Sequence, residues 1–244
     1  MAATVAEQLV EMLKNAGIRR VYGVTGDSLN FLNDALRRDG HIDWIQVRHE
    51  EVGAYAAMAE GVLGGLGCCA GSSGPGHVHL INGLYDAHRW GAPVIALAST
   101  ITSEDYGTES FQSTDLNMFD GCSHYNEVAM TPPQLPRMLQ QALQHAWSRK
   151  GVGVCAFPGD LMTCNAEEDL VWGDLYRPES VLHPSEKEIQ ALAELINTCD
   201  DIGIYAGIGC ADARAEVIEL AHVLKAPMAY TLKAKMALEY DNPY

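Results

Sequence analysis

Two adjacent carboxylates, Glu50 and Glu51, stand where an apolar stretch gives way to a run of small residues. Residues 42–47 favour a buried strand, and residues 50–63 favour a helix rich in alanine and glycine. A carboxylate at the carboxyl end of such a strand lies where open α/β sheets place the groups that face a ligand. The alternative is structural, because acidic side chains at a helix start stabilise the helix dipole by roughly 0.3–1 kcal/mol each. These two residues alone leave both interpretations open.

Two glycine-rich segments are candidates for binding phosphate. Residues 71–76 (GSSGPG) precede an expected helix, where exposed backbone N–H groups can cradle a phosphate. They lack the Gly-Lys-Ser/Thr ending of a nucleotide P-loop and the spacing of a dinucleotide fingerprint, so a tight turn explains them equally well. Residues 207–213 follow an expected strand and open a helix. They are closer to a dinucleotide loop, but alone they are a weak signal.

The histidines and cysteines predict neither a metal site nor a hydrolase. His77 and His79 are two residues apart on an expected helix, so they do not face one another. No acidic partner is evident for them or for His88, and we therefore predict no metal site. The sequence has no Gly-x-Ser-x-Gly elbow, and Cys68 and Cys69 fall inside an expected strand rather than at an electropositive turn.

The composition describes an ordinary globular protein with a large core. Of the 244 residues, 48% are hydrophobic and 20% are charged, and the formal net charge is −16. Acidic residues predominate in both halves, which excludes a basic face for nucleic acid. Seven cysteines without a C-x-x-C pair suit reduced thiols in the cytoplasm. No signal peptide or membrane-spanning apolar run is present, so we expect a cytoplasmic protein.

Short strands and helices alternate over the first 157 residues. We expect helices over 4–16, 30–36, 50–63, 77–89 and 133–147, and strands over 20–24, 42–47, 67–70, 93–98, 124–130 and 153–157. This alternation predicts an α/β fold with a doubly wound parallel sheet and helices on both faces. Residues 100–121 form a polar connection of the length that tends to be functional.

A second, shorter α/β unit is expected after an acidic linker over residues 163–184. It has a helix over 185–198, with Ser185 and Glu188 spaced as a capping box, and a second helix over 212–224. Two strands, over 202–206 and 227–232, are too few to form a sheet buried on both sides. We therefore expect either that the chain is a fragment or that a partner completes this unit.

Seven motifs occur in an order and spacing that resembles a known family. They are residues 24–30 (VTGDSLN), 48–51 (RHEE), 71–76 (GSSGPG), 81–84 (INGL), 111–112 (FQ), 158–160 (PGD) and 205–210 (YAGIGC). Together they resemble the amino-terminal part of the thiamine-diphosphate-dependent enzymes that act on pyruvate. Pyruvate oxidase and quinone-dependent pyruvate dehydrogenase are the most similar, and acetolactate synthase comes next.

The resemblance implies three α/β domains, of which the chain holds less than two. Residues 1–180 are expected to be the pyrimidine-binding domain, and residues 185–244 an incomplete middle domain of the FAD-binding type. The third domain carries Gly-Asp-Gly and a later Asn-Asn, which bind Mg²⁺ and the diphosphate. Neither motif is present, so the Mg²⁺ ligands are expected in a carboxyl-terminal domain that this sequence lacks.

The resemblance also implies roles for individual residues. Glu50 is the catalytic carboxyl, which hydrogen-bonds the ring nitrogen of the aminopyrimidine and favours the imino tautomer that deprotonates the thiazolium carbon. Glu51 keeps the structural role at the helix start. The other implied contacts are Thr25, Gly26, Pro75 and Gly76 with the pyrimidine of thiamine diphosphate, Phe111 and Gln112 with the substrate, and Gly207, Gly209, Thr231 and Leu232 with FAD.

The implied reaction is the oxidative decarboxylation of pyruvate. FAD passes the electrons to a quinone, which gives acetate, or to oxygen, which gives acetyl phosphate. In this family the cofactor lies between subunits, so we expect a homo-oligomer, a dimer or a tetramer, and little activity from the isolated chain. The full-length enzyme is expected in the cytoplasm, with a quinone-linked form peripheral to the inner face of the membrane.

Three alternatives remain open at this point. One is an acetolactate synthase-like carboligase, and another is a non-catalytic binding or dimerisation module that keeps the fold. The third, a nicotinamide-dependent dehydrogenase, rests only on the loop at Gly207. Substrate preference is also open, because Ser113 stands where the family often has Glu and His77 where it usually has Asn or Ala.

Overall fold

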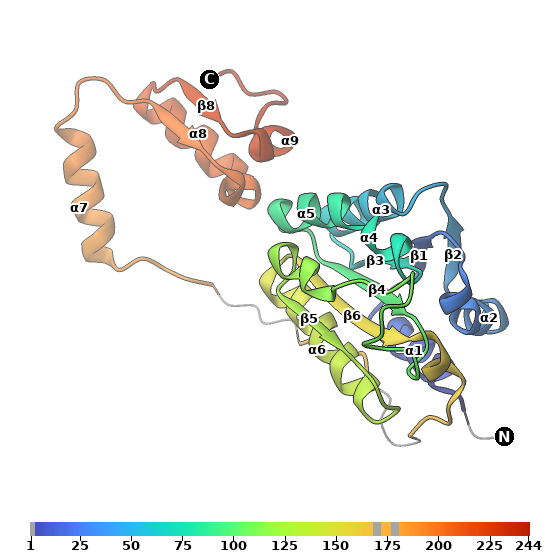
Figure 1. The fold of residues 1–244 in the computed structure, drawn as a ribbon. Coiled ribbons are helices and arrows are strands. Elements are labelled where there is room, and N and C mark those ends of the chain that lie inside the picture. Colours follow the sequence, from blue (N-terminus) through green and yellow to red (C-terminus); the bar gives the residue numbers. More distant parts are fainter. Residues whose placement is uncertain (1–2, 168–171, 177–180) are drawn as a thin grey trace. The chain divides into compact units, whose positions relative to one another are not determined.

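The structure is a computed structural model that describes residues 3–167, 172–176 and 181–244. The chain divides into two compact units, residues 1–178 and residues 179–244 (Figure 1). Within the described ranges, no helix has the length and apolar character needed to cross a membrane. The assignment of the two units as pyrimidine-binding and FAD-binding-like domains stays a prediction.

The first unit is built on a six-stranded sheet in which every neighbouring pair is parallel. Its spatial order is β2 (Asp43–Gln46), β1 (Arg20–Gly23), β3 (Gly67–Gly71), β4 (Val94–Thr100), β6 (Val152–Pro158) and β5 (Tyr125–Val128). The chain passes from β1 to β2 on one side and later returns to β3 on the other side of β1. The loops after β1 and β3 therefore diverge at a topological switch point, which is where open α/β sheets bind ligands.

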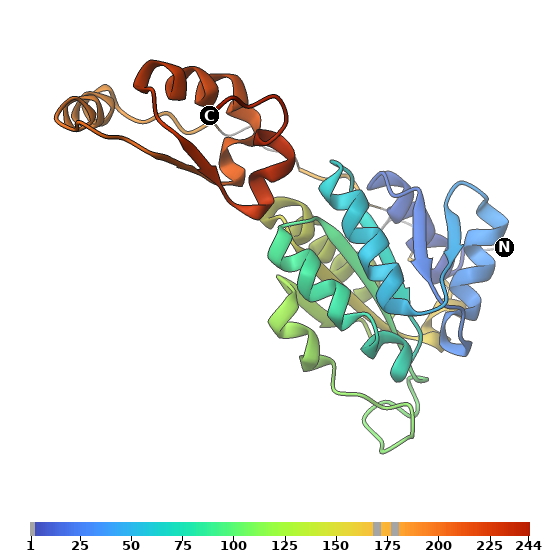
Figure 2. The same ribbon diagram turned by 90° about the horizontal axis from the view of Figure 1, so that it is seen from above.

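Helices cover both faces of this sheet, as Figure 1 and Figure 2 show. Helices α1 (Val5–Asn15), α2 (Asn30–Asp39) and α6 (Gln134–Arg149) supply residues of one core, and α3 (Glu50–Val62) and α5 (Ile81–Trp90) supply residues of the other. The doubly wound α/β fold predicted from the sequence is confirmed.

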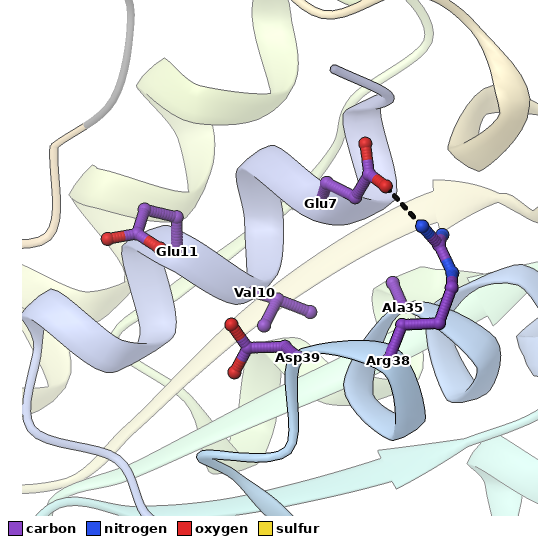
Figure 3. Close-up of a pocket in the computed structure, with 6 residues that line it drawn as sticks. All are labelled: Glu7, Val10, Glu11, Ala35, Arg38 and Asp39. Atoms are coloured by element: carbon purple, nitrogen blue, oxygen red, sulfur yellow. Dashed lines mark hydrogen bonds and ion pairs between the residues drawn. The ribbon is translucent and has the colours of Figure 1, made fainter. Parts of the chain in front are cut away.

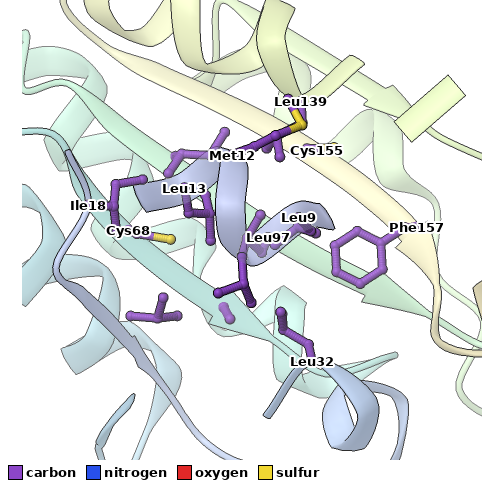
Figure 4. Close-up of a cluster of buried hydrophobic side chains, with 14 of the residues drawn as sticks. Leu9, Met12, Leu13, Ile18, Leu32, Cys68, Leu97, Leu139, Cys155 and Phe157 are labelled. Carbon is purple, nitrogen blue, oxygen red and sulfur yellow. The ribbon is translucent and has the colours of Figure 1, made fainter. Parts of the chain in front are cut away.

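Alternate residues of the central strands enter the two cores. On β4, Ile95 and Leu97 pack beneath α1, whereas Val94 and Ala96 pack beneath α3 and α5. Figure 4 shows the first core, where Leu9 of α1 lies close to Leu97 and Phe157. This two-faced burial follows from the period of two along a strand, and it explains why every residue of β4 and β6 is buried.

Two expected elements of the first unit differ in the structure. The helix expected over 77–89 is split into a short α4 (Pro75–Val78) and α5. The Leu80 amide bonds to the His77 carbonyl three residues back, at 3.2 Å, which interrupts the regular ladder. The connection over 100–121 ends in a 3₁₀ helix (Leu116–Cys122), because its residues Leu116, Phe119 and Cys122 are spaced by three and buried.

Part of the expected linker belongs to the first unit. Trp172 and Leu175 pack against the core beneath α1 and α6. The side chain of Gln140 accepts a hydrogen bond from the Gly173 amide at 2.8 Å and donates one to the Asp174 carbonyl at 2.9 Å. This amide side chain satisfies backbone groups that have no sheet partner, so residues 172–176 are held against α6.

The second unit has two parallel strands, β7 (Ile204–Ala206) and β8 (Met228–Tyr230). Its helices are α7 (Glu186–Asn197), α8 (Arg214–Leu224) and α9 (Lys235–Leu238), and 3₁₀ helices span Ile208–Ala213 and Leu232–Ala234. The predicted capping box is confirmed, because Ser185 accepts from the Glu188 amide at 3.3 Å while the Glu188 carboxylate accepts from the Ser185 amide at 2.8 Å.

The packing beneath α1 predicts different effects on stability for two leucine-to-alanine substitutions. Leu97→Ala removes a fully buried side chain and should lower the free energy of unfolding by about 2–5 kcal/mol. Leu63→Ala removes a side chain that is 80% exposed and should change it by about 0.5 kcal/mol or less. Urea unfolding followed by circular dichroism measures both. Equal effects would contradict the two-faced burial of the sheet.

Candidate functional site

Glu50 lies at the carboxyl end of β2 and begins α3. The Val47 amide bonds to the Gly23 carbonyl at 3.0 Å, so the chain stays beside β1 until just before the helix. His49 caps α3, because its Nδ1 accepts from the Glu51 amide at 3.3 Å. Glu50 is only 8% exposed, and in the part of the chain that the structure describes it is the one buried carboxylate.

The partner of Glu50 is His79. The His79 Nδ1 lies 2.9 Å from Glu50 Oε2, where an N–H on that nitrogen donates to the carboxylate. The His49 ring stacks on His79 with a centroid separation of 4.3 Å. Our expectation that His79 lacks an acidic partner was therefore wrong. Glu50 is 29 residues away in sequence, and the pair forms because α3 lies directly against α5.

Glycines open the backbone beside this carboxylate. A Cβ at Gly76 would lie 3.4 Å from Glu50 Oε1 and 3.1 Å from Ser72 Cβ, and one at Gly26 would collide with Ser72 Oγ at 2.3 Å. Ser72 in turn shares a hydrogen bond of 2.9 Å with Ser28. The loops after β1 and β3 therefore meet next to Glu50. Glu50 Oε2 is hydrogen-bonded to His79, and Glu50 Oε1 faces Gly76.

The other two residues predicted to contact the pyrimidine are Pro75 and Thr25. Pro75 occupies the first turn of α4, directly before Gly76. Thr25 instead lines a cavity of about 380 Å³ with residues of α2 and β2, among them Asn33 and Trp44. The roles of these residues toward a cofactor stay predictions.

His77 ties the long connection after β4 to the site. It is buried, its Nδ1 lies 2.9 Å from the Ser99 carbonyl, and its Nε2 is hydrogen-bonded to Thr114 Oγ1. The carbonyl can only accept, so Nδ1 carries the proton. Burial lowers the pKa of the His77 imidazole, although the bond to Ser99 opposes that effect.

The same connection encloses a cavity of about 200 Å³. It is lined by His77, Thr100, Ile101, Tyr106, Gly107, Thr108, Gln112, Ser113 and Thr114. Gln112 is held in place because its Oε1 accepts from Ser73 Oγ at 3.0 Å, whereas Phe111 is 92% exposed and is not among the lining residues. A substrate role for this pair stays a prediction.

The motif at residues 158–160 anchors the start of that connection. Asp160 Oδ1 accepts from the Ser103 amide at 2.8 Å, and its Oδ2 accepts from Ser103 Oγ at 2.6 Å. A Cβ at Gly159 would come within 2.8 Å of the Ser28 carbonyl. The role of this motif in the structure is thus to hold the connection near the loop after β1. The sequence alone predicts no such structural role for the motif.

In the second unit, the predicted FAD contacts lie at the carboxyl ends of the two strands. The Thr231 amide bonds to the Ala206 carbonyl at 3.0 Å, which brings the segments after β7 and β8 together. Leu232 is 77% exposed, and a Cβ at Gly207 or Gly209 would meet nothing within 4 Å. Among the described residues of this unit, no close approach therefore requires these glycines, and their contact with FAD stays a prediction.

The buried thiols and the cavity between α1 and α2 are weaker candidates for a catalytic site than the region around Glu50. Burial raises the pKa of Cys69 to about 12 and that of Cys68 well above its ordinary value, so these thiols stay protonated and unreactive. A cavity of about 270 Å³ between α1 and α2 contains Glu7 and Arg38, which form an ion pair (Figure 3). Its other carboxylates, Glu11 and Asp39, are both paired with Lys14, so the polar groups of this cavity already have partners.

Comparisons with known proteins identify the family. Residues 3–119 match the model described as "Thiamine pyrophosphate enzyme, N-terminal TPP binding domain", and residues 189–244 match "Thiamine pyrophosphate enzyme, central domain". The chain belongs to the thiamine pyrophosphate enzyme family. The resemblance drawn from the ordered motifs is confirmed at this level.

Individual relatives of this thiamine pyrophosphate enzyme chain have different names. It is 46% identical to an uncharacterized 42.6 kDa protein of Pseudomonas amyloderamosa (98% of this chain, 61% of the relative). It is 37% identical to the putative thiamine pyrophosphate-containing protein YdaP of Bacillus subtilis (99% and 42%) and 34% identical to pyruvate oxidase of Lactiplantibacillus plantarum (93% and 38%). Proteins named acetolactate synthase also match. The chain spans about two to three fifths of the length of the first three.

The buried histidine predicts a pH dependence of stability. Because the pKa of His77 is lower in the folded chain than its ordinary value of 6.5, the unfolded chain binds a proton first as the pH falls. The free energy of unfolding should therefore decrease as the pH drops below about 6.5. His77→Asn should make this decrease shallower between pH 7 and pH 5, measured by urea unfolding at each pH.

His124, whose pKa burial also lowers, keeps part of the slope in every variant. Carboxylates with lowered pKa values, such as Asp39, lose their contribution only below their ordinary value near 4, outside this window. An identical slope for His77→Asn and the native chain would contradict the assignment.

Proposed function

We propose that Glu50 binds and activates the aminopyrimidine of thiamine diphosphate, in an enzyme that oxidatively decarboxylates pyruvate. The observation that supports this proposal is the buried Glu50 carboxylate at the topological switch point, with the open backbone of Gly76 beside it. The chain spans less than two thirds of the length of the relatives it matches, so the activity of a whole enzyme is part of the proposal.

The residues around Glu50 fit an aminopyrimidine. A flat ring can approach Oε1 because neither Gly76 nor Gly26 carries a side chain, and either Cβ would crowd Ser72. A carboxyl group at Oε1 can donate to a ring nitrogen, which needs a donor rather than another acceptor. Thiamine diphosphate, when bound, supplies a carbon nucleophile that adds to the keto carbon of the substrate.

His79 connects the buried carboxyl to solvent. Its side chain is 43% exposed while that of Glu50 is 10% exposed, so the imidazole links Oε2 to solvent and stays hydrogen-bonded to it. With His79 donating to Oε2, a protonated Glu50 carries its hydrogen on Oε1, and Oε1 is then the oxygen that donates to a ring nitrogen. The chain's own residues thereby hold the proton that the cofactor's activation requires.

Pyruvate is the proposed substrate because the chain resembles pyruvate oxidase and because Gln112 lines a small cavity without charged side chains. FAD, Mg²⁺ and a homo-oligomeric assembly belong to this proposal as well. We expect FAD at the second unit and the Mg²⁺ and diphosphate ligands outside this sequence. The second candidate is a carboligase, which the matches to proteins named acetolactate synthase favour.

Glu50 and Glu51 provide a matched pair of substitutions. The chain is mixed with the carboxyl-terminal part of the Lactiplantibacillus plantarum pyruvate oxidase, and CO₂ release from pyruvate is measured with thiamine diphosphate. Glu50→Gln should lower the rate by on the order of 100-fold or more, because an amide cannot supply the carboxyl proton. Glu51→Gln should stay within a few-fold of the native rate.

Two results would count against this assignment. A Glu50→Gln chain as active as the native chain would remove Glu50 from the mechanism. A native mixture that binds thiamine diphosphate but releases no CO₂ would favour a non-catalytic module with this fold. Circular dichroism of both variants establishes that they remain folded.

The products separate the oxidase from the carboligase. The proposed oxidase should convert pyruvate to acetate or acetyl phosphate only when FAD and an electron acceptor are present. A carboligase would form acetolactate from two pyruvate molecules without an external acceptor. Chromatography of the complemented reaction with and without the acceptor distinguishes them, and acetolactate as the main product would overturn the oxidase assignment.

A further inference from the structure

A cluster of three potential metal ligands surrounds the buried carboxylate. His49, Glu50 and His79 each offer one ligand atom, and these atoms all lie within 4.8 Å of one another. In the described part of the chain, no other group of three or more His, Cys, Asp or Glu side chains converges in this way. Two imidazoles and one carboxylate form a donor set that Zn²⁺ uses in open sites, where water completes the coordination.

We propose that His49, Glu50 and His79 bind a divalent transition metal ion such as Zn²⁺ when the cofactor is absent. The two outer ligands reach the site from solvent, because their side chains are 47% and 43% exposed. Glu50 is the ligand held in place by the fold, since its side chain is only 10% exposed and the residue is the first of helix α3. The ion has an entry path and one rigid anchor.

Small movements of the three side chains would bring their ligand atoms around one metal ion. Glu50 Oε2 and His79 Nδ1 are 2.9 Å apart, so a metal ion displaces the proton between them and binds both atoms. The rings of His49 and His79 are stacked with an interplanar angle of 21°, so the exposed His49 ring must turn to direct a nitrogen at the ion. In the cap, His49 Nδ1 accepts from the Glu51 amide and Nε2 carries the proton, so the ring gives up the cap contact when its unprotonated nitrogen binds the ion.

The surrounding charge favours a cation. Glu51 Oε2 lies 3.7 Å from His49 Nδ1 and adds a second carboxylate at the edge of the cluster. The chain carries a net charge of −16, which raises the local concentration of cations. Two imidazole nitrogens select a borderline-soft ion over Mg²⁺, which prefers oxygen ligands and retained water.

Metal binding here would regulate the proposed function, on which this consequence rests. An ion bound to Oε2 coordinates the Glu50 carboxylate and displaces its proton, so Glu50 can no longer donate a hydrogen bond to a ring nitrogen. Zn²⁺ and the aminopyrimidine should therefore exclude one another. The cofactor-free protein should be sensitive to zinc, and the cofactor-loaded protein should be protected.

Zinc titration of the 244-residue protein tests the site. Calorimetry with ZnCl₂, without thiamine diphosphate, should show one site per chain that weakens at least tenfold in His49→Asn and in His79→Asn. Asparagine at position 49 is a good helix cap and at position 79 can still donate to Glu50, so both variants should fold. His183→Asn, which alters an exposed histidine outside the cluster, should leave this site unchanged.

A spectroscopic measurement identifies the ligands. Co²⁺ in place of Zn²⁺ should give the strong visible absorption of a four-coordinate site, and this absorption should disappear in both cluster variants. Equal zinc affinities in the native chain and the two variants would overturn the proposal. A weak six-coordinate Co²⁺ spectrum that the variants do not change would also overturn it.

A competition experiment separates this proposal from the proposed function. Saturating thiamine diphosphate should reduce the apparent zinc affinity at least tenfold. An unchanged zinc affinity, with the cofactor bound in a separate titration, would refute mutual exclusion. Failure of thiamine diphosphate to bind the complemented enzyme would refute the role of Glu50 toward the cofactor, while the zinc titrations would still decide the metal site.

Discussion

Burial of the Glu50 carboxylate is the constraint on which the site depends. A carboxylate removed from water without a partner is strongly unfavourable, so the fold must bring a donor to it. That donor, His79, comes from the segment after β3 and meets Glu50 because α3 packs against α5 and, on its other side, closely on β3. Gly67 allows this approach, since a Cβ there would lie 1.9 Å from the Ala57 carbonyl oxygen of α3.

The loops around the site are fastened to one another rather than to the sheet alone. The Ser73 amide and Ser72 Oγ both bond to Ser28 Oγ, and Ser99 Oγ bonds to the Ser28 carbonyl at 2.8 Å. His77 then joins Ser99 to Thr114. Segments that follow three different strands are thereby linked, so a change in one loop is transmitted to the position of the next.

The sequence predicts features that depend on neighbouring residues and misses those that depend on distant ones. The sheet strands follow from periodicity, and the cap at Ser185 follows from one local spacing. The pairing of His79 with Glu50 joins the start of α3 to the turn between α4 and α5, and the docking of Trp172 depends on the face that α6 presents. Family motifs located Gly76 and Gln112, but no local pattern shows that His77 is buried or that Phe111 is exposed.

The order of the strands also has a consequence for synthesis of the chain. Strand β5 pairs only with β6, and β6 inserts between β5 and β4, with Val94 opposite Val152. During translation, β4 therefore keeps an unpaired apolar edge until about residue 158 has left the ribosome. Closure of the sheet is a late, non-local event, so the nascent chain depends on protection of that edge from other chains.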